Sequence, residues 1–205
     1  MKTNDNPDTN STTNAQVEEV QTAALQDDFT KEFIPSTEET EEGYYTFESG
    51  VGGYTMLYPV NALMDQAYYQ YRGQDFEAFY FWESKEKENS RYYVQGTFED
   101  EESTEWNDSY LNLLIGSANL NIEDFEHYEM NGNDVYFAPY IHEINDNKNG
   151  FFYNFFSFVK DQDSNKAMSI IYGANCLEED QECSLDMEKE RKKAEKIIHS
   201  IRFNP

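Results

Sequence analysis

The sequence predicts an α+β fold, in which three helices cover a mostly antiparallel sheet of about six to seven strands behind a disordered acidic N-terminal tail. Three observations predict it. Runs of alternating aromatic and polar residues are typical of strands with one buried face. Apolar residues recur at helical spacing in three other segments, and the composition changes abruptly near Gly43.

The change near Gly43 predicts the domain organisation. Residues 1–42 contain no Gly, Tyr or Trp and are rich in Asn, Thr, Asp and Glu, whereas all 16 Tyr and both Trp follow. A segment with so little apolar surface cannot offset the entropy lost on folding. We therefore expect residues 1–43 to form a disordered acidic tether and residues 44–205 to form a single α+β domain.

The first half of the expected domain mixes strands with one helix. Residues 44–58 predict two strands joined by a glycine-rich turn. Residues 60–72 predict a short helix, because apolar residues recur every three or four positions and Gly73 follows where a helix commonly ends. Residues 76–83 and 91–98 predict a hairpin.

The second half predicts a helix over 104–119, then a run of antiparallel strands. Asn131-Gly132 is a strong tight-turn pair and places a hairpin over 125–144. Two further strands are expected over 151–160 and 167–175.

The last element is expected to be a helix that begins after Ser184, which we interpret as its N-cap. One side of this helix is mostly apolar, through Met187, Ala194, Ile198 and Ile201.

The charge excludes some functions. The chain has 41 acidic and 15 basic residues and a formal net charge of −26. Repulsion disfavours direct binding to nucleic-acid phosphates or to an anionic membrane surface. The charge fits cationic partners or metal ions, and it equally fits a solvated surface without a specific site. No segment approaches the roughly 20 apolar residues of a membrane-spanning helix.

The two cysteines, Cys176 and Cys183, are separated by six residues of a polar, acidic segment. Their proximity predicts a disulfide between a strand and a helix, and with it an oxidising, extracytoplasmic compartment. The alternative is two free thiols in a cytosolic protein. A metal site is disfavoured, because the spacing is not C-x-x-C and no further ligands lie nearby.

No set of residues predicts catalysis, a cofactor or a metal site, and we expect the chain not to be an enzyme. His127 and His142 fall on adjacent predicted strands, where ordinary strand histidines are favoured over a catalytic or metal-binding pair. Asp161, Asp163 and Asn165 resemble the start of a calcium loop. That loop lacks its glycine and its final glutamate, so a hairpin turn is predicted instead.

An exposed aromatic face is the candidate binding surface. Three tyrosines crowd the predicted 60–72 helix, and two consecutive ones place a ring on each face of a strand. Surface tyrosines suit contact with protein or carbohydrate. The alternative is that these large rings cover a small core. The candidate residues are Tyr68, Tyr69, Tyr71, Tyr92 and Tyr93.

Two short motifs carry a resemblance to known families. Residues 54–59 read YTMLYP before the first predicted helix, and residues 197–203 read IIHSIRF at the end of the chain. Both resemble motifs of PsbP-like domains, and the polar tail followed by a compact domain resembles small lipoproteins of low-GC Gram-positive bacteria. The resemblance implies a PsbP-like α/β/α sandwich, a non-enzymatic binding module, and a lipid-modified cysteine upstream of Met1.

These observations lead to a functional expectation. We expect a non-enzymatic extracytoplasmic lipoprotein that is anchored to the cell membrane and binds a protein or cell-envelope component. It contacts the membrane only through an N-terminal lipid anchor and does not bind nucleic acid. The alternative is a cytoplasmic acidic protein that mimics nucleic acid or caps a basic partner. A hydrolase is a third hypothesis, which requires His127 and His142 to meet in a pocket.

Overall fold

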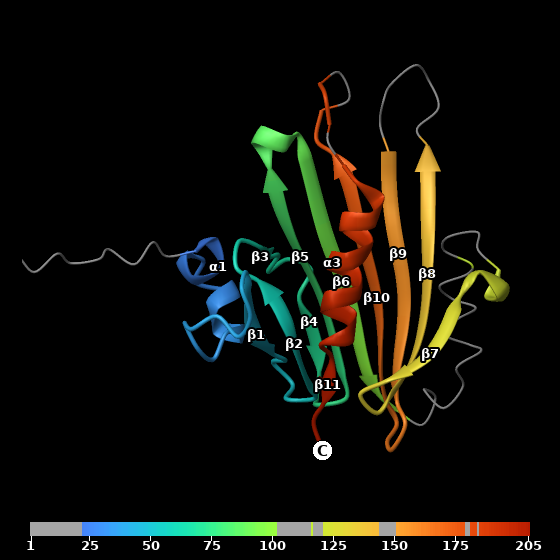
Figure 1. The fold of residues 1–205 in the computed structure, drawn as a ribbon. Coiled ribbons are helices and arrows are strands. Elements are labelled where there is room, and N and C mark those ends of the chain that lie inside the picture. Colours follow the sequence, from blue (N-terminus) through green and yellow to red (C-terminus); the bar gives the residue numbers. More distant parts are fainter. Residues whose placement is uncertain (1–21, 102–115, 117–120, 144–150, 179–180, 184) are drawn as a thin grey trace, which may run out of the picture.

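The computed structural model describes residues 22–101, 116, 121–143, 151–178, 181–183 and 185–205 (Figure 1). Its strands are β1 (Tyr44–Glu48), β2 (Tyr54–Pro59), β3 (Leu63–Met64), β4 (Gln70–Arg72), β5 (Phe76–Lys85), β6 (Ser90–Asp100), β7 (Glu126–Met130), β8 (Asn133–Glu143), β9 (Phe151–Asp161), β10 (Lys166–Cys176) and β11 (Arg202–Phe203). The α-helices in the same residues are α1 (Ala23–Gln26) and α3 (Met187–His199), and the 3-10 helices are η1 (Thr30–Phe33), η2 (Glu86–Glu88) and η4 (Ile122–Asp124).

A large antiparallel sheet of eight strands organises the domain. Its order is β3-β5-β6-β10-β9-β8-β7, and β4 also pairs with β5. The long strands β5, β6, β8, β9 and β10 follow sequences in which residues alternate between the two faces, as the pleat requires.

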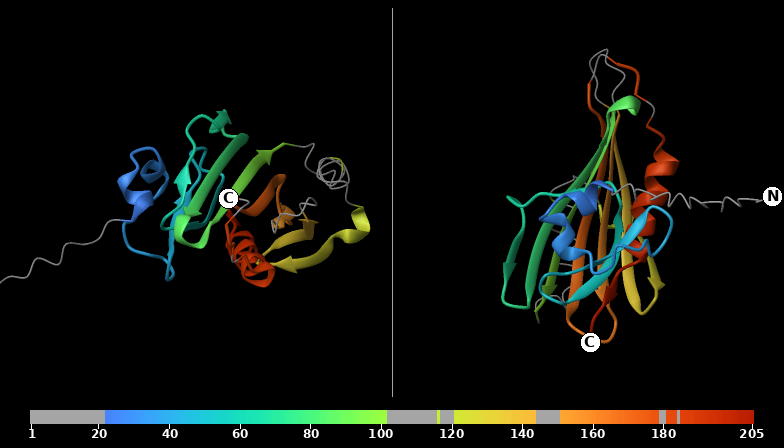
Figure 2. Two further views of the ribbon diagram at one scale, coloured as in Figure 1. Left: turned by 90° about the horizontal axis from the view of Figure 1, so that it is seen from above. Right: turned by 90° about the vertical axis from the view of Figure 1, so that its left-hand side faces the viewer.

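One face of the large sheet, called here the inner face, packs against a second layer. That layer contains the three-stranded sheet β1-β2-β11, helix α3 and the short N-terminal helices. Figure 2 shows α3 lying on this face of the sheet. The core between the layers is built mainly from aromatic rings and aliphatic side chains, each about 1% exposed or less: Phe47, Phe79, Phe81, Val94, Phe98, Phe155, Val159, Ile170, Ile197 and Ile198. Burying each of them contributes about 1.5–3 kcal/mol.

The predicted α/β/α sandwich with three helices is wrong. Residues 60–72 form no helix; they contain the short strands β3 and β4, which extend the large sheet beyond β5. Helical spacing was present there, but a helix of 13 residues is marginal on its own, and Tyr, Asn, Asp and Val occupy six of its positions. The exposed edge of β5 offered backbone hydrogen bonds instead. The predicted helix over 104–119 lies outside the described residues except for Gly116.

The predicted hairpins are confirmed. Strand β5 pairs with β6, β7 with β8, and β9 with β10. The turn between β7 and β8 has φ values of 56° at Asn131 and 82° at Gly132, the left-handed values of a tight hairpin turn.

Helix α3 is confirmed, but it begins two residues later than predicted. Its N-cap is Asp186, whose side chain accepts a hydrogen bond of 3.0 Å from the backbone N–H of Lys189. Ser184, the predicted cap, lies outside the described residues. The helix buries Ala194, Ile197 and Ile198 against the inner face, as its apolar periodicity predicts.

The packed structure extends further toward the N-terminus than residue 44. Ala24, Thr30 and Phe33 are buried, and the backbone N–H of Ala24 donates to the carbonyl of Val60 at 3.1 Å. Thr30 Oγ1 also accepts a hydrogen bond of 2.9 Å from the N–H of Met64. These contacts join η1 and α1 to the edge of the large sheet. Residues 1–21 lie outside the described residues, so their role as a tether stays a prediction.

The disulfide predicted between Cys176 and Cys183 is present, with the two Cα atoms 5.8 Å apart. It closes the segment that leads from β10 to α3. Asn89 holds the same segment, because its side chain exchanges hydrogen bonds of 2.8 Å with the backbone of Glu178. Among the described residues, no helix is both long and apolar enough to cross a membrane.

Candidate functional site

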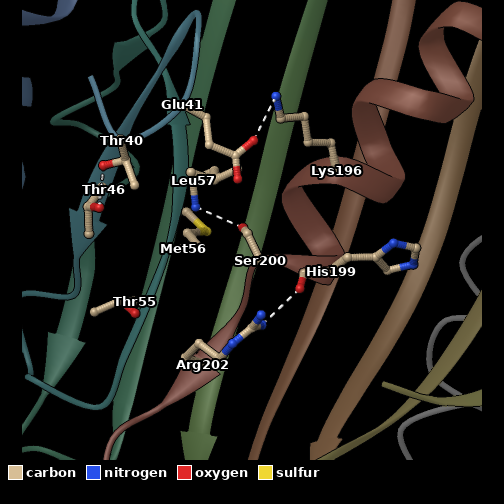
Figure 3. A pocket seen from close by; sticks show the side chains of 10 residues that line it. All are labelled: Thr40, Glu41, Thr46, Thr55, Met56, Leu57, Lys196, His199, Ser200 and Arg202. Carbon is tan, nitrogen blue, oxygen red and sulfur yellow. Dashed lines mark hydrogen bonds and ion pairs between the residues drawn. The ribbon is translucent and has the colours of Figure 1, made fainter. Parts of the chain in front are cut away.

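A polar cleft of about 540 Å³ lies where the end of α3 meets the small sheet (Figure 3). It is lined from three sides: by the segment before β1, by β1 and β2, and by the end of α3 with β11. Its lining residues are Thr40, Glu41, Thr46, Thr55, Met56, Leu57, Lys196, His199, Ser200 and Arg202.

The polar groups of this cleft already bond to one another. Lys196 pairs with Glu41 at 3.1 Å, and its ammonium lies 4.2 Å from the centre of the Tyr44 ring. Ser200 Oγ donates to the carbonyl of Ile197 at 2.6 Å and accepts from the N–H of Leu57 at 2.8 Å. These contacts fasten the N-terminal segment and β2 to α3.

The remaining charged groups of the cleft are also engaged. Arg202 donates to the backbone carbonyls of His199 and Ile201 at 2.8 and 2.7 Å. His199 Nε2 lies 2.7 Å from the hydroxyl of Tyr128, and burial lowers the pKa of His199. We therefore interpret the cleft as the place where the small sheet and the segment before β1 are held to α3, rather than as a ligand site.

A second polar cluster lies beneath α3. Glu190 is only 6% exposed; it accepts hydrogen bonds from the hydroxyl of Tyr172 and, at 2.6 Å, from Lys193. The Tyr92 ring stacks on that of Tyr172, with centroids 5.4 Å apart, and its hydroxyl donates to Glu83 at 2.8 Å. These groups satisfy one another inside the domain.

The opposite face of the large sheet, called here the outer face, carries a row of aromatic rings. The ring centroids are 5.4 Å apart between Tyr68 and Tyr80, 5.5 Å between Tyr80 and Tyr93, and 6.4 Å between Tyr93 and Phe152. Tyr68 comes from the turn between β3 and β4, and the others come from β5, β6 and β9. We call these four residues the aromatic row.

A glycine makes room for the centre of the row. Strand β10 runs between β6 and β9, and its Gly173 pairs with Tyr93 across the strands. A Cβ atom at Gly173 would lie 2.2 Å from Cζ of the Tyr93 ring. The ring of Tyr93 therefore lies flat over β10, and only glycine permits this approach.

Polar atoms without partners lie beside the row. Arg91 and Asn175 face each other across β6 and β10, two residues along from Tyr93 and Gly173, and so on the same face. Arg91 Nε and Asn175 Oδ1 are both buried without a hydrogen-bond partner. Burial raises the pKa of Tyr80 and of Tyr93, and the nearby charge of Arg91 acts in the opposite direction on both.

The structure separates the five predicted surface tyrosines. Tyr68 and Tyr71 are 62% and 69% exposed, and Tyr93 is half-buried in the aromatic row. Tyr69 is half-buried and donates to the buried Glu77 at 2.7 Å, while Tyr92 belongs to the interior cluster beneath α3.

Only Tyr68 and Tyr93 therefore share the outer face. Tyr80 and Phe152, which join them, were missed, although alternation along 76–83 places Tyr80 opposite the core residues Phe79 and Phe81.

The predicted histidine pair does not meet. His127 pairs across the strands with Tyr136 of β8, with ring centroids 4.3 Å apart, and its Nε2 lies 3.4 Å from Asp134. His142 lies six residues beyond Tyr136 in β8, where it pairs with Phe152 of β9. Six residues of extended strand span about 20 Å. The hydrolase hypothesis, which required the two histidines in one pocket, loses its basis.

The calcium-like segment is a hairpin turn between β9 and β10, as predicted. The ammonium of Lys160 donates to the carbonyls of Asp161 and Ser164 in this turn. Among the described residues, no group of three or more His, Cys, Asp or Glu side chains is arranged to hold a metal ion.

In the part of the chain that the structure describes, the geometry defines a class of protein: an antiparallel β domain with helix α3 and a small three-stranded sheet on one face and an aromatic row on the other. A family model described as "Putative lipoprotein YvcA" matches residues 20–202, and the chain belongs to this family. It is also 31% identical over 193 residues to the protein named "Putative lipoprotein YvcA" from Bacillus subtilis (strain 168), covering 89% of this chain and 77% of that relative. The predicted resemblance to lipoproteins is thereby confirmed at the level of the family.

Proposed function

We propose that this chain is the extracytoplasmic part of a lipid-anchored protein and that it acts by binding, with the aromatic row as its recognition surface. The family description supports the lipid anchor. The disulfide between Cys176 and Cys183 supports an oxidising compartment outside the cytoplasm, because such bonds are rare in reducing compartments.

The observation that carries the binding surface is the contrast between satisfied and unsatisfied groups. In the cleft, the charged side chains have internal partners, whereas beside the aromatic row Arg91 Nε and Asn175 Oδ1 have none. A buried polar atom without a partner costs about 1–3 kcal/mol, so such atoms next to partly exposed rings favour a site completed by a ligand.

Binding is favoured over catalysis by what the reactive side chains are doing. Both cysteines are consumed in the disulfide, so the chain has no thiol nucleophile. His199 is engaged by Tyr128 at the rim of the cleft, and His127 is stacked on a tyrosine at the edge of the sheet. The partner proposed is a protein or another component of the cell envelope, and the net charge of −26 disfavours nucleic acid.

The lipid anchor is tested by expressing the gene with its native upstream sequence in a Bacillus host supplied with radioactive palmitate. The expected result is a labelled protein in the membrane fraction that becomes accessible to protease once the cell wall is removed. An unlabelled protein in the cytoplasmic fraction would contradict the proposal.

The binding surface is tested by sedimenting the purified protein with cell envelopes from cells that lack it. Arg91→Gln and Tyr80→Ala are expected to reduce co-sedimentation at least tenfold. Tyr71→Ala is the control for tyrosine removal, because Tyr71 is 69% exposed but shares the face of Glu77 rather than that of the aromatic row. Equal co-sedimentation of all three variants and the wild type would contradict the assignment of the surface.

A further inference from the structure

We propose that the aromatic row binds a neutral polysaccharide, with sugar rings packed on the tyrosines and sugar hydroxyls bonded to Arg91 and Asn175. This inference rests on the proposed function, since it names the ligand class of the same surface. Three features of the outer face lead to it: the shape of the row, the chemistry of its unpartnered atoms, and the charge of the chain.

The row is extended rather than compact. Its four rings cross β5, β6 and β9, and neighbouring centroids are 5.4 to 6.4 Å apart. A pyranose ring presents a face of C–H bonds, which packs well on the negative face of an aromatic ring. Several rings in line can contact several consecutive sugars, so the row fits a chain better than a single small molecule.

The unpartnered atoms are one donor and one acceptor. Arg91 Nε carries a proton to donate, and Asn175 Oδ1 accepts. A sugar hydroxyl both donates and accepts, so adjacent hydroxyls of one sugar can satisfy both atoms. Asn154, whose Oδ1 accepts from the hydroxyl of Tyr93 at 3.2 Å, places a further amide at the same end of the row.

The charge of the chain argues that the polysaccharide is neutral. With 41 acidic against 15 basic residues, the protein repels a polyanion at long range. Arg91 is one positive charge beside the row, which is too little to overcome that repulsion. A neutral chain is not repelled, and Arg91 can still donate hydrogen bonds to its hydroxyls.

Other buried atoms without partners do not offer the same opportunity. Glu99 Oε2 lies on the outer face, but it is six residues, about 20 Å, along β6 from Tyr93. Glu77 Oε2, Ser157 Oγ and the hydroxyls of Tyr54 and Tyr58 also have no hydrogen-bond partner, but these four residues are fully buried in the core. A ligand cannot reach them without opening the core. Arg91 and Asn175 are only partly buried as residues and lie beside rings that reach solvent.

The inference is tested by affinity electrophoresis of the purified protein in native gels. The gels contain hydroxyethylcellulose, dextran, polygalacturonate, or no polymer. Wild type and Tyr71→Ala are expected to be retarded by at least one of the two neutral polymers and not by polygalacturonate. Tyr80→Ala and Arg91→Gln are expected to lose at least 80% of that retardation. Thermal unfolding of each variant shows whether it is folded.

The outcomes separate this inference from the proposed function. If neither neutral polymer retards the wild type, or if only polygalacturonate does, the neutral-polysaccharide assignment is overturned. If retardation persists in the folded Tyr80→Ala and Arg91→Gln proteins, the site assignment is overturned. If envelope binding is lost on protease treatment of the envelopes but kept after their glycans are digested, the partner is a protein: the proposed function stands and this inference fails.

Discussion

Tyrosines on the two faces of the large sheet behave differently, although their sequence context is alike. Tyr92 and Tyr93 are neighbours in β6, yet Tyr92 is 6% exposed and donates to Glu83 under α3, whereas Tyr93 lies half-buried among outer rings. Tyr172 likewise donates to the buried Glu190. Beneath α3 the hydroxyls of Tyr92 and Tyr172 find partners within the domain, while on the outer face Arg91 Nε and Asn175 Oδ1 do not. The hydroxyls of Tyr54 and Tyr58 also have no partner, but these two residues are fully buried in the core. The difference shows that unpartnered polar atoms beside partly exposed rings, rather than aromatic content, distinguish a binding surface from a core.

The largest expected effect on the free energy of unfolding comes from replacing one tyrosine on each face with alanine. Tyr172→Ala removes a ring that is 1% exposed and leaves Glu190 without its hydroxyl partner, so we expect it to lower the free energy of unfolding by about 3–5 kcal/mol. Tyr68→Ala removes a ring that is 62% exposed and should change it by less than about 0.5 kcal/mol. Urea unfolding monitored by tryptophan fluorescence measures both. Similar losses in the two variants would mean that the outer row is structural.

Removing the disulfide should loosen the inner layer more than the outer face. The double variant Cys176→Ser, Cys183→Ser frees the segment that leads from β10 to α3, and we expect a loss of about 2–3 kcal/mol in the chain-entropy account. The same unfolding measurement, with the wild type in reducing agent as a parallel sample, checks it. The rings of the aromatic row lie outside this segment, but Asn175 directly precedes Cys176 and donates to its carbonyl at 2.8 Å. Envelope binding at low temperature should therefore weaken less than in Tyr80→Ala. Loss of binding in the folded double variant would contradict the separation of the two faces.

The sequence predicted the strands well because alternation is a local property. The hairpins around Asn131-Gly132 and over 76–98 need only neighbouring residues and turn chemistry, and both are as predicted. The failed helix over 60–72 had a local pattern too, but edge pairing with β5 decided its structure. The number of layers and helices depends on such long-range pairing, which a single sequence does not reveal.

The candidate surface was predicted only in part for the same reason. Tyr68 and Tyr93 were identified as surface rings, but Tyr92 was assigned to the surface because nothing local distinguishes it from its neighbour in β6. The register across β6, β10 and β9 brings Tyr93, Gly173 and Phe152 together. The reason for a glycine at position 173 becomes visible only when the Tyr93 ring is seen to lie over it.

A substitution at Gly173 tests the outer face from beneath. In Gly173→Ala the new methyl group meets the Tyr93 ring, which must move, and we expect a loss of about 1–3 kcal/mol together with weakened envelope binding. Thermal unfolding and co-sedimentation measure the two effects. Gly132→Ala is the control for glycine replacement: nothing lies near its Cβ position, although its φ of 82° makes the change destabilising in its own right. Only Gly173→Ala should weaken envelope binding. Equal binding by both variants would contradict the assignment of the aromatic row as the binding surface.

The smallest expected effect is a pH dependence that belongs to the inner face. Glu77 is fully buried and accepts hydrogen bonds of 2.7 Å from the N–H of Gly50 and from Tyr69; burial raises its pKa above the ordinary 4.5, and the bonds only partly oppose that shift. A raised pKa in the folded state means that the stability contributed by the protonated form is complete below about pH 4.5 and is lost as the pH rises through the folded value.

Glu77→Gln keeps an acceptor oxygen for Gly50 and Tyr69 and removes the titration. The free energy of unfolding, measured by urea titration from pH 4 to pH 8, should therefore fall more steeply with rising pH in the wild type than in the variant. The difference between the two proteins isolates Glu77, because every other carboxylate is common to both. Parallel curves would show that Glu77 is ionised at little cost inside the domain. In that case Glu77 Oε2 would have to gain a hydrogen-bond partner that the structure does not give it.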